Sequence, residues 1–385
     1  MNETNDKGTG RSLSSPRYHR IVAKLGTSLL TGGSDRLDEA MMSSLVAQIA
    51  QLHNQGLEFL LVTSGAMASG RYELGLTRKP KGVSLRQVLA SVGQGRLMQV
   101  YDRLFNRHDI TVAQALLTKT DLCDRAGYLN ARNTLLALLE LRVLCVINEN
   151  DVVSTDEIKE AQFGDNDNLS AMVANLVDAD LLLILGEVAG LYDADPCCDP
   201  GACLVPQVEK INSSIEQLAA STTSRLGIGG MVTKIEAAKL ATASGVTVVI
   251  ASGRENDVIL RVMAGEDIGT RFLPVTSRME SRKRWMLSGL SAKGGVVVDE
   301  GAVQALKKYK RSLLAAGIGQ VKDKFQRGDI VTIYGPEGSR LGCGISNYGS
   351  ADVETIKGGH SRKIAALLGY DYGPEVVHRN NLVIF

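Results

Sequence analysis

The sequence predicts an α/β protein: a three-layer sandwich around a mostly parallel sheet, followed by a small β-rich domain. Short apolar runs alternate with longer helical stretches as far as Phe272. The runs are apolar throughout rather than at every second residue, which is typical of parallel strands covered by helices on both faces. After Phe272 the pattern changes to glycines and short β-type runs, which predicts a separate domain.

The elements of the sandwich follow from these runs. Strands are expected at Ile21–Ala23, Phe59–Val62, Val143–Ile147, Leu181–Leu185 and Val246–Ile250. Helices are expected at Asp38–Asn54, Leu129–Leu141, Leu169–Val177 and Lys234–Ser244. Strand–helix alternation favours a parallel sheet with crossover helices. Ligands of such sheets bind beyond the carboxyl ends of the strands, so the loops after these strands are expected to carry the chemistry.

Four segments are expected along the chain: a disordered polar tail (1–17), the α/β domain (18–272), a linker (273–283) and the β-rich domain (284–385). The linker prediction rests on the polar, aperiodic stretch Leu273–Arg284. In the last segment, strands are expected at Gly294–Val298, Ile330–Tyr334 and Leu382–Phe385, with a helix at Gly301–Tyr309. This mixture of short strands and glycines is typical of a small barrel-like domain.

Composition excludes several classes of protein. The 385 residues are 44% hydrophobic with a net charge of +1, so the chain can build a core and has no overall field for nucleic acid or membranes. From Lys283 onward there are 15 Lys and Arg against 9 Asp and Glu, which supports a domain boundary and hints at an anionic partner.

No membrane span, secretion signal or metal site is expected. No apolar run approaches the roughly 20 residues of a membrane span, and the N-terminus has no apolar signal-peptide core. The six cysteines show no CxxC spacing and no accompanying histidines, which favours reduced thiols over a zinc site. We therefore expect a cytoplasmic protein.

Two loops combine glycine with lysine. Lys24-Leu25-Gly26-Thr27-Ser28 follows the first strand, and Gly227-Ile228-Gly229-Gly230-Met231-Val232-Thr233-Lys234 opens a helix. Glycine lets backbone N–H groups approach a phosphate, and lysine adds a positive charge. Either loop alone could be an ordinary turn, but two of them on one sheet favour phosphoryl transfer.

Three further loops carry hydroxyl, amide and carboxyl groups. Thr63-Ser64-Gly65-Ala66 lacks the GxSxG pattern of a serine hydrolase, so we expect Ser64 to bind substrate or to cap a helix. Ile147-Asn148-Glu149-Asn150-Asp151 and Gly164-Asp165-Asn166-Asp167-Asn168 gather acids and amides that could bind a metal or a substrate ammonium.

Taken in order, these five blocks resemble the glutamate 5-kinase family of the amino acid kinase superfamily. The stretches Gly294–Ala302, Ser312–Ile318 and Arg327-Gly328-Asp329 resemble a PUA domain, a small RNA-binding module. The resemblance implies an amino acid kinase fold with a PUA-like barrel, and ATP-dependent phosphorylation of the side-chain carboxylate of L-glutamate in proline biosynthesis. It also implies Mg²⁺, feedback inhibition by proline, a homo-oligomer formed through the kinase domain, and RNA as a further partner.

Family roles transfer position by position. The resemblance implies that Lys24 and Lys234 hold the phosphates and that Asp167 organises both lysines. It implies that Ser64, Asp151 and Asn166 bind glutamate. The implied ATP-binding positions are Lys24, Gly26, Gly186, Glu187, Gly229, Gly230, Met231, Val232, Thr233 and Lys234.

The chain departs from the family pattern at three places. Gly186-Glu187 stands where a Thr-Asp or Ser-Asp pair is usual, and Ile228 replaces a threonine, so both changes fall near the nucleotide. In the C-terminal part, Lys322-Asp323-Lys324-Phe325 lacks the usual glycine before Phe325. Two alternatives remain open: another kinase of the same fold, such as aspartate or uridylate kinase, and an RNA-binding regulatory protein on an inactive kinase domain.

Overall fold

The computed structural model describes residues 17–34, 36–76, 82–153, 166–196, 198–221, 230–275 and 294–385. Contacts divide the chain into two compact units. The first comprises residues up to Leu116, Leu139–Ala241 and Val246–Leu273, and the second comprises Leu117–Leu138, Thr242–Gly245 and Pro274–Phe385. Nearly all of the predicted tail and most of the predicted linker lie outside the described residues.

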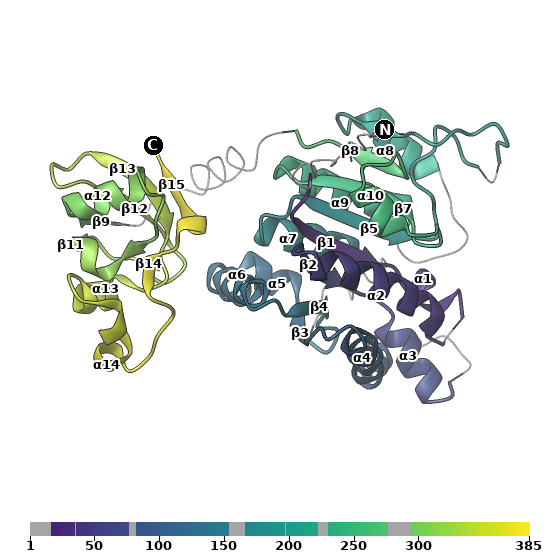
Figure 1. Cartoon of the computed structure of the whole chain (residues 1–385), viewed down its shortest axis with the longest axis horizontal. Helices are drawn as coiled ribbons and strands as arrows, with labels where there is room; N and C mark the ends of the chain where they lie inside the picture. The colour runs from purple at the N-terminus through teal and green to yellow at the C-terminus, as the bar shows by residue number, and fades with distance from the viewer. Residues whose placement is uncertain are drawn as a thin grey trace, which may run out of the picture. The chain divides into compact units, whose positions relative to one another are not determined.

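Figure 1 shows the elements in chain order. Up to Phe272 the strands are β1 (Arg20–Leu25), β2 (Glu58–Val62), β3 (Val112–Leu117), β4 (Leu144–Glu149), β5 (Leu181–Gly186), β6 (Gln207–Val208), β7 (Thr247–Ser252) and β8 (Thr270–Phe272). The helices are α1 (Thr27–Thr31), α2 (Glu39–Asn54), α3 (Ala66–Glu73), α4 (Val83–Asn106), α5 (Lys119–Cys123), α6 (Arg125–Glu140), α7 (Asn166–Leu176), α8 (Ser213–Ser221), α9 (Met231–Ala243) and α10 (Val258–Met263).

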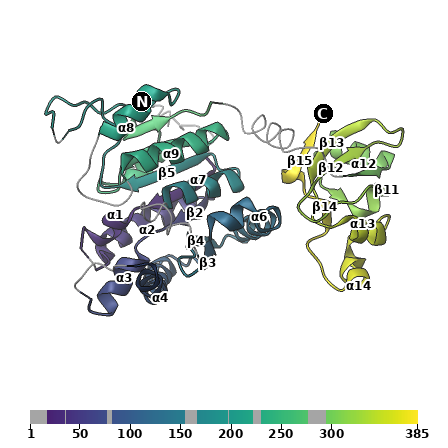
Figure 2. The ribbon, with the colours of Figure 1, turned by 180° about the vertical axis from the view of Figure 1, so that it is seen from behind.

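A mostly parallel sheet forms the middle layer. Its strand order is β3-β4-β2-β1-β5-β7-β8-β6, and β4, β2, β1, β5 and β7 are parallel to one another. Helices α1, α2, α4 and α10 pack on one face, where their apolar side chains share a core with alternate residues of the strands. Helices α7 and α9 lie on the other face (Figure 2). The predicted three-layer sandwich is therefore confirmed.

All five predicted strands of the sandwich overlap observed ones, because each is buried on both faces. β5, for example, is buried at every position. The strands that periodicity did not predict are β3, β6 and β8. β3 is only half-buried and β6 and β8 have two or three residues, so none presents a long apolar run.

Three helices begin earlier than predicted, and two of these changes involve the site. Helix α6 begins at Arg125 rather than Leu129. Helix α7 begins at Asn166 rather than Leu169, so Asn166 and Asp167 belong to its first turn instead of a loop. Helix α9 begins at Met231 rather than Lys234. A carboxylate is favourable in the first turn of a helix because the backbone N–H groups there carry partial positive charge. The prediction from apolar periodicity missed this turn of α7 because its residues are polar.

The second unit contains a five-stranded sheet of order β11-β9-β12-β13-β15 and a two-stranded sheet of β10 and β14. The strands are β9 (Gly295–Val298), β10 (Leu313–Leu314), β11 (Ile318–Lys322), β12 (Ile330–Tyr334), β13 (Arg340–Ile345), β14 (Glu375–Val377) and β15 (Leu382–Ile384). The helices of its C-terminal part are α12 (Glu300–Lys307), α13 (Ser350–Ile356) and α14 (Ile364–Leu368), and they share one apolar core with the strands. The strand-rich C-terminal region is as predicted.

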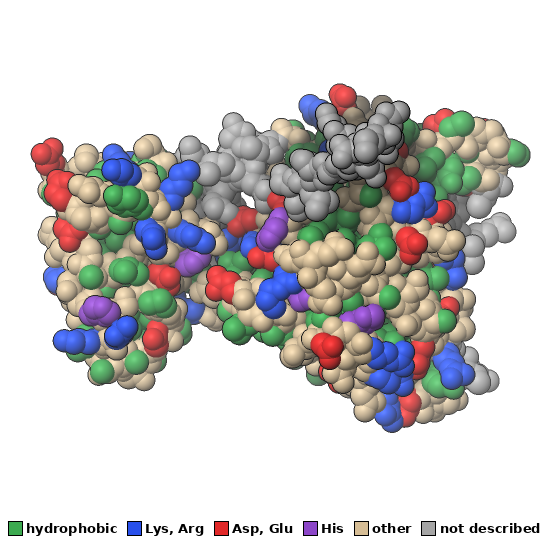
Figure 3. Space-filling view, in the orientation of Figure 1, with side chains coloured by type: hydrophobic (Ala, Val, Ile, Leu, Met, Phe, Trp, Pro, Cys, Tyr) green, Lys and Arg blue, Asp and Glu red, His purple; other side chains and the backbone are tan. Residues whose placement is uncertain are grey.

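The surface in view mixes charge signs. Figure 3 shows acidic and basic side chains intermingled over both units. Within the described ranges, no helix is long and apolar enough to cross a membrane.

Candidate active site

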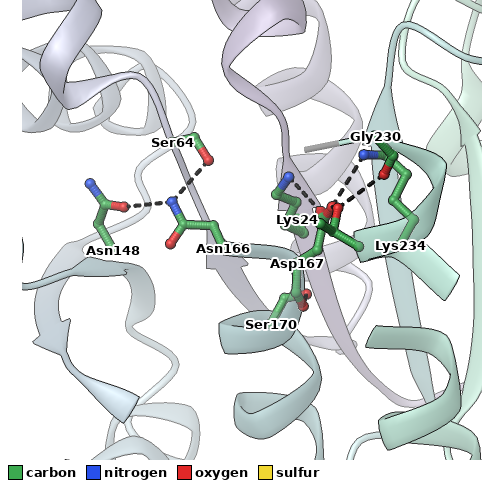
Figure 4. A network of polar contacts seen from close by, with 9 residues as sticks. Lys24, Ser64, Asn148, Asn166, Asp167, Ser170, Gly230 and Lys234 are labelled. Carbon is green, nitrogen blue, oxygen red and sulfur yellow. Dashed lines mark hydrogen bonds and ion pairs between the residues drawn. The ribbon is translucent and has the colours of Figure 1, made fainter. Parts of the chain in front are cut away.

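The site lies where the central parallel strands end. Because β2, β1, β5 and β7 run parallel and adjacent, the residues after each strand meet at one edge of the sheet. Lys24 is the fifth residue of β1, and the loop with Ser64 follows β2. The first turns of α7 and α9 contribute Asp167 and Lys234 to the same place (Figure 4).

Asp167 holds both lysines. The Nζ of Lys24 lies 2.6 Å from Oδ1 of Asp167, and the Nζ of Lys234 lies 3.1 Å from Oδ2. The hydroxyl of Thr233 donates to the same Oδ2 over 2.9 Å. All three charged side chains are buried. The structure thus brings together the three residues for which the sequence predicted catalytic roles.

The ion pairs fix the charge of Asp167. Burial by itself raises the pKa of this carboxyl group, but the positive charges of Lys24 and Lys234 outweigh it and lower the pKa from 3.8 to about 2. Asp167 is therefore ionised at neutral pH. With both lysines charged, the cluster keeps one net positive charge, which suits an anionic ligand such as a phosphate.

A chain of amides adjoins the lysines. The Nδ2 of Asn166 donates to Oγ of Ser64 over 3.0 Å and to Oδ1 of Asn148 over 3.1 Å (Figure 4). Ser64, Asn148 and Asn166 are all buried. Asp151, the third predicted substrate residue, is half-buried in the turn that follows β4. Polar groups that could hold an amino acid thus lie on the β2–β4 side of the lysines.

The predicted nucleotide residues lie on the other side, around β5. A Cβ atom at Gly186 would lie 3.6 Å from Cε of Lys234, so this glycine borders the lysine. Gly230, Met231 and Val232 lead into and begin α9. Gly229 and Ile228 lie outside the described residues.

Two predicted nucleotide residues are already engaged within the chain. The N–H of Gly26 donates to the carbonyl of Leu185 over 3.0 Å. This differs from the expectation that Gly26 offers its N–H to phosphate. Glu187 forms a two-point ion pair with Arg254, with N–O distances of 2.6 and 2.9 Å. Glu187, which stands where the family pattern has an aspartate, therefore has a basic partner on the loop after β7.

Sequence reasoning gave no role to four residues at this edge. Asn148 belongs to the motif Ile147-Asn148-Glu149-Asn150-Asp151, and its position near the end of β4 could have identified it as a site residue. Gln94 accepts a hydrogen bond from Nδ2 of Asn148 over 2.8 Å. Tyr101 shares a 2.7 Å hydrogen bond with Thr63, and burial raises the pKa of Tyr101 well above its usual range. Gln94 and Tyr101 lie within a long helix and Arg254 on a loop, and no motif marks them.

Comparison with known proteins agrees with this geometry. The profile of the amino acid kinase family matches residues 19–252, and that of the PUA domain matches residues 294–368. The chain belongs to the amino acid kinase family. The first match spans the strands and helices that carry both lysines and the amide chain.

Several curated relatives match over nearly their whole length, and each is named glutamate 5-kinase. The protein of Dehalococcoides mccartyi (strain CBDB1) is 56% identical over 95% of this chain and 98% of its own. The protein of Herpetosiphon aurantiacus is 51% identical over 96% of this chain and 99% of its own. The protein of Shewanella halifaxensis is 48% identical over 97% of this chain and 100% of its own.

Proposed function

We propose that this amino acid kinase transfers the γ-phosphoryl group of ATP to the side-chain carboxylate of L-glutamate. The product is L-glutamyl 5-phosphate, and the reaction is the first step of proline biosynthesis. The observation that carries the proposal is the Lys24–Asp167–Lys234 cluster beside a buried chain of amides. Relatives about half identical to this chain bear the name of this activity.

The reaction requires positive charge more than a base. The glutamate carboxylate, with a reference pKa near 4.3, is already an anion at neutral pH, so no proton has to be removed. Bringing it to an anionic phosphate costs on the order of 4 kcal/mol per charge pair at about 4 Å and an effective dielectric near 20. Lys24 and Lys234 offset this repulsion and stabilise the charge on the transferring group.

Asp167 prepares the two lysines in advance. Two ammonium groups buried close together repel each other, and the shared carboxylate holds them in place. Their positions are therefore set before ATP binds, and little reorganisation is needed during transfer. Positioning of the two substrates supplies the rest of the rate enhancement.

Mg²⁺ is proposed to enter with the nucleotide. Within the described ranges, no group of three or more His, Cys, Asp or Glu side chains could hold a metal ion, and the Asp167 carboxylate already pairs with two lysines. Mg²⁺ is commonly held by substrate phosphates with few protein ligands. We therefore assign it to the phosphate oxygens of ATP, where it would neutralise charge.

Asp151 is proposed to select free glutamate over its acetylated form. Free glutamate carries an α-ammonium that a carboxylate can pair with, whereas N-acetylglutamate has no such charge. Binding the acetylated form would leave the carboxylate without its counter-charge. Aspartate is shorter by one methylene group, so its carboxylate would fall short of the lysines.

The test is product trapping with hydroxylamine. The purified protein is incubated with ATP, Mg²⁺ and glutamate, aspartate or N-acetylglutamate, and any acyl phosphate is converted to a hydroxamate. We expect a hydroxamate with glutamate only. Lys234→Ala should abolish it. Lys239→Ala is the matched control, because Lys239 lies on the same helix, is exposed and pairs with Glu216 at the surface.

Absence of a hydroxamate with all three substrates, from protein shown to be folded, would contradict the kinase proposal. Equal activity of the Lys234→Ala variant and the wild type would leave the reaction in place but remove this lysine from it. Inhibition by proline and assembly into a homo-oligomer remain predictions from the resemblance.

We propose single-stranded RNA as a second ligand, bound by the PUA-like part. Tyr370 and Tyr372 are exposed with ring centroids 5.3 Å apart, and the guanidinium of Arg327 lies 3.9 Å from the Tyr372 ring centroid. Exposed rings with a nearby arginine are a platform on which bases stack. Labelled RNA should bind the full chain at low salt, and more weakly after Tyr372→Ala than after Tyr309→Ala. No binding at low salt would contradict this.

A further inference from the structure

The amide chain beside the lysines has a direction. In each amide the nitrogen only donates hydrogen bonds and the oxygen only accepts them. The Nδ2 of Asn166 gives both of its hydrogens, to Ser64 and to Oδ1 of Asn148. Asn148 then donates through its own Nδ2 to Oε1 of Gln94. The orientation of one amide therefore sets the orientation of the next.

Because the hydrogen bonds run from Asn166 through Asn148 to Gln94, one polar atom at each end of this chain of amides is left unpaired. Oδ1 of Asn166 and Nε2 of Gln94 are both buried, and neither has a hydrogen-bond partner among the residues that the structure describes. Asn166 is 6% exposed, so its unpaired oxygen is well shielded from bulk water. Buried polar groups are normally paired, and a protein that leaves an acceptor and a donor unpaired on one chain of amides is suited to a ligand that pairs both.

We propose that Gln94 is a substrate-specificity residue: its Nε2 binds the α-carboxylate of the amino acid, while Oδ1 of Asn166 accepts from the α-ammonium. This rests on the proposed glutamate kinase activity and assigns which group of the substrate each amide recognises. A zwitterionic amino acid carries both a hydrogen-bond acceptor and a donor, which are the two kinds of group that the unpaired atoms require.

The placement also fixes which way the substrate points. Asn166 and Asp167 are neighbours in the first turn of α7, and Asp167 holds the two lysines. The side-chain carboxylate of glutamate can therefore lie toward Lys24 and Lys234 while its α-groups lie toward Asn148 and Gln94. The nucleotide is left with the opposite side, around β5 and β7.

Close helix packing holds Gln94 at this position. A Cβ atom on the preceding residue, Gly93, would lie 1.8 Å from the carbonyl oxygen of Ala66, so α4 approaches the start of α3 as closely as a glycine permits. About two turns further along α4, Tyr101 bonds to Thr63. Two contacts thus fix α4 against the loop that carries Ser64.

The test combines residue changes with truncated ligands in the full chain. Gln94→Met keeps the length of the side chain and removes its amide. Glutarate lacks the α-ammonium and 4-aminobutyrate lacks the α-carboxylate, and each is measured as an inhibitor competing with glutamate. Gln99→Met on the exposed side of the same helix is the control.

We expect Gln94→Met to raise KM for glutamate and the inhibition constant of glutarate by roughly 10- to 100-fold, the effect of losing a hydrogen bond to a charged group. The inhibition constant of 4-aminobutyrate and KM for ATP should stay within about twofold, because neither ligand presents an α-carboxylate to Gln94. Gln94→Glu, which places a negative charge there, should weaken glutarate further still.

Equal weakening of glutarate and 4-aminobutyrate would overturn the proposal and reduce Gln94 to a support for Asn148. An unchanged KM for glutamate would also overturn it. Failure of the glutamate kinase proposal would appear separately, as a wild-type protein that forms no hydroxamate with glutamate.

Discussion

Replacing Asp167 by asparagine should destabilise the protein and disable its pair of lysines. The Asp167 carboxylate is 2% exposed and lies 2.6 Å and 3.1 Å from the two ammonium groups. Its pKa, lowered from 3.8 to about 2, corresponds to about 2 kcal/mol of stability at neutral pH. The variant also leaves two buried positive charges without an anion, and breaking a buried pair costs about 3–5 kcal/mol. We therefore expect Asp167→Asn to lower the free energy of unfolding by about 3 kcal/mol.

The assay is urea unfolding of the wild type and of Asp167→Asn, each measured over a range of pH. A lowered carboxyl pKa gives stability that is fully present above the unfolded pKa and is lost as the pH falls through the folded pKa. The difference in free energy of unfolding between the wild type and Asp167→Asn should therefore be largest near neutral pH. It should become smaller between about pH 4 and pH 2. Asp267→Asn changes a side chain that is 83% exposed, so its free energy of unfolding should stay close to that of the wild type at every pH.

Anions and activity give independent readouts. Sulfate or ATP should stabilise Asp167→Asn more than the wild type, because an anion can replace the missing carboxylate between the lysines. The rate of hydroxamate formation should fall on the order of 100-fold or more. Equal unfolding midpoints for Asp167→Asn and the wild type, with no change in their difference from pH 7 to pH 3, would refute the reasoning.

Two further predictions concern the packing of α4 and the nucleotide side. Gly93→Ala should lower the stability by about 1–3 kcal/mol and raise KM for glutamate, because the new methyl group collides with the Ala66 carbonyl. Gly95→Ala, whose Cβ meets nothing within 4 Å, is the thermal-unfolding control, and equal melting temperatures for the two variants would contradict the packing argument. Glu187→Ala should release Arg254 and change KM for ATP in steady-state kinetics. It should alter stability by no more than about 1 kcal/mol, since the pair is exposed, and an altered KM for glutamate instead would contradict its assignment to the nucleotide side.

The sequence by itself determined the fold class and the chemistry. Strands such as β1 and β5 are buried on both faces, so their residues must be apolar and their positions can be read from the chain. Lys24, Asp167 and Lys234 stand in short local motifs, because glycine, lysine and acid are required at fixed places relative to a strand end or a helix start. Composition and motif together were sufficient to predict a kinase with a β-rich C-terminal domain.

Only the tertiary structure decided which side chains meet and what remains unpaired. Gln94 and Asn148 are separated by 54 positions, and Ser64 and Asn166 by 102, yet both pairs are hydrogen-bonded. The contact of Gln94 depends on how closely α4 packs, which is set by steric fit at Gly93 rather than by any local pattern. The unpaired atoms at the two ends of the amide chain are a property of burial and hydrogen-bond direction in three dimensions, and a linear motif contains neither.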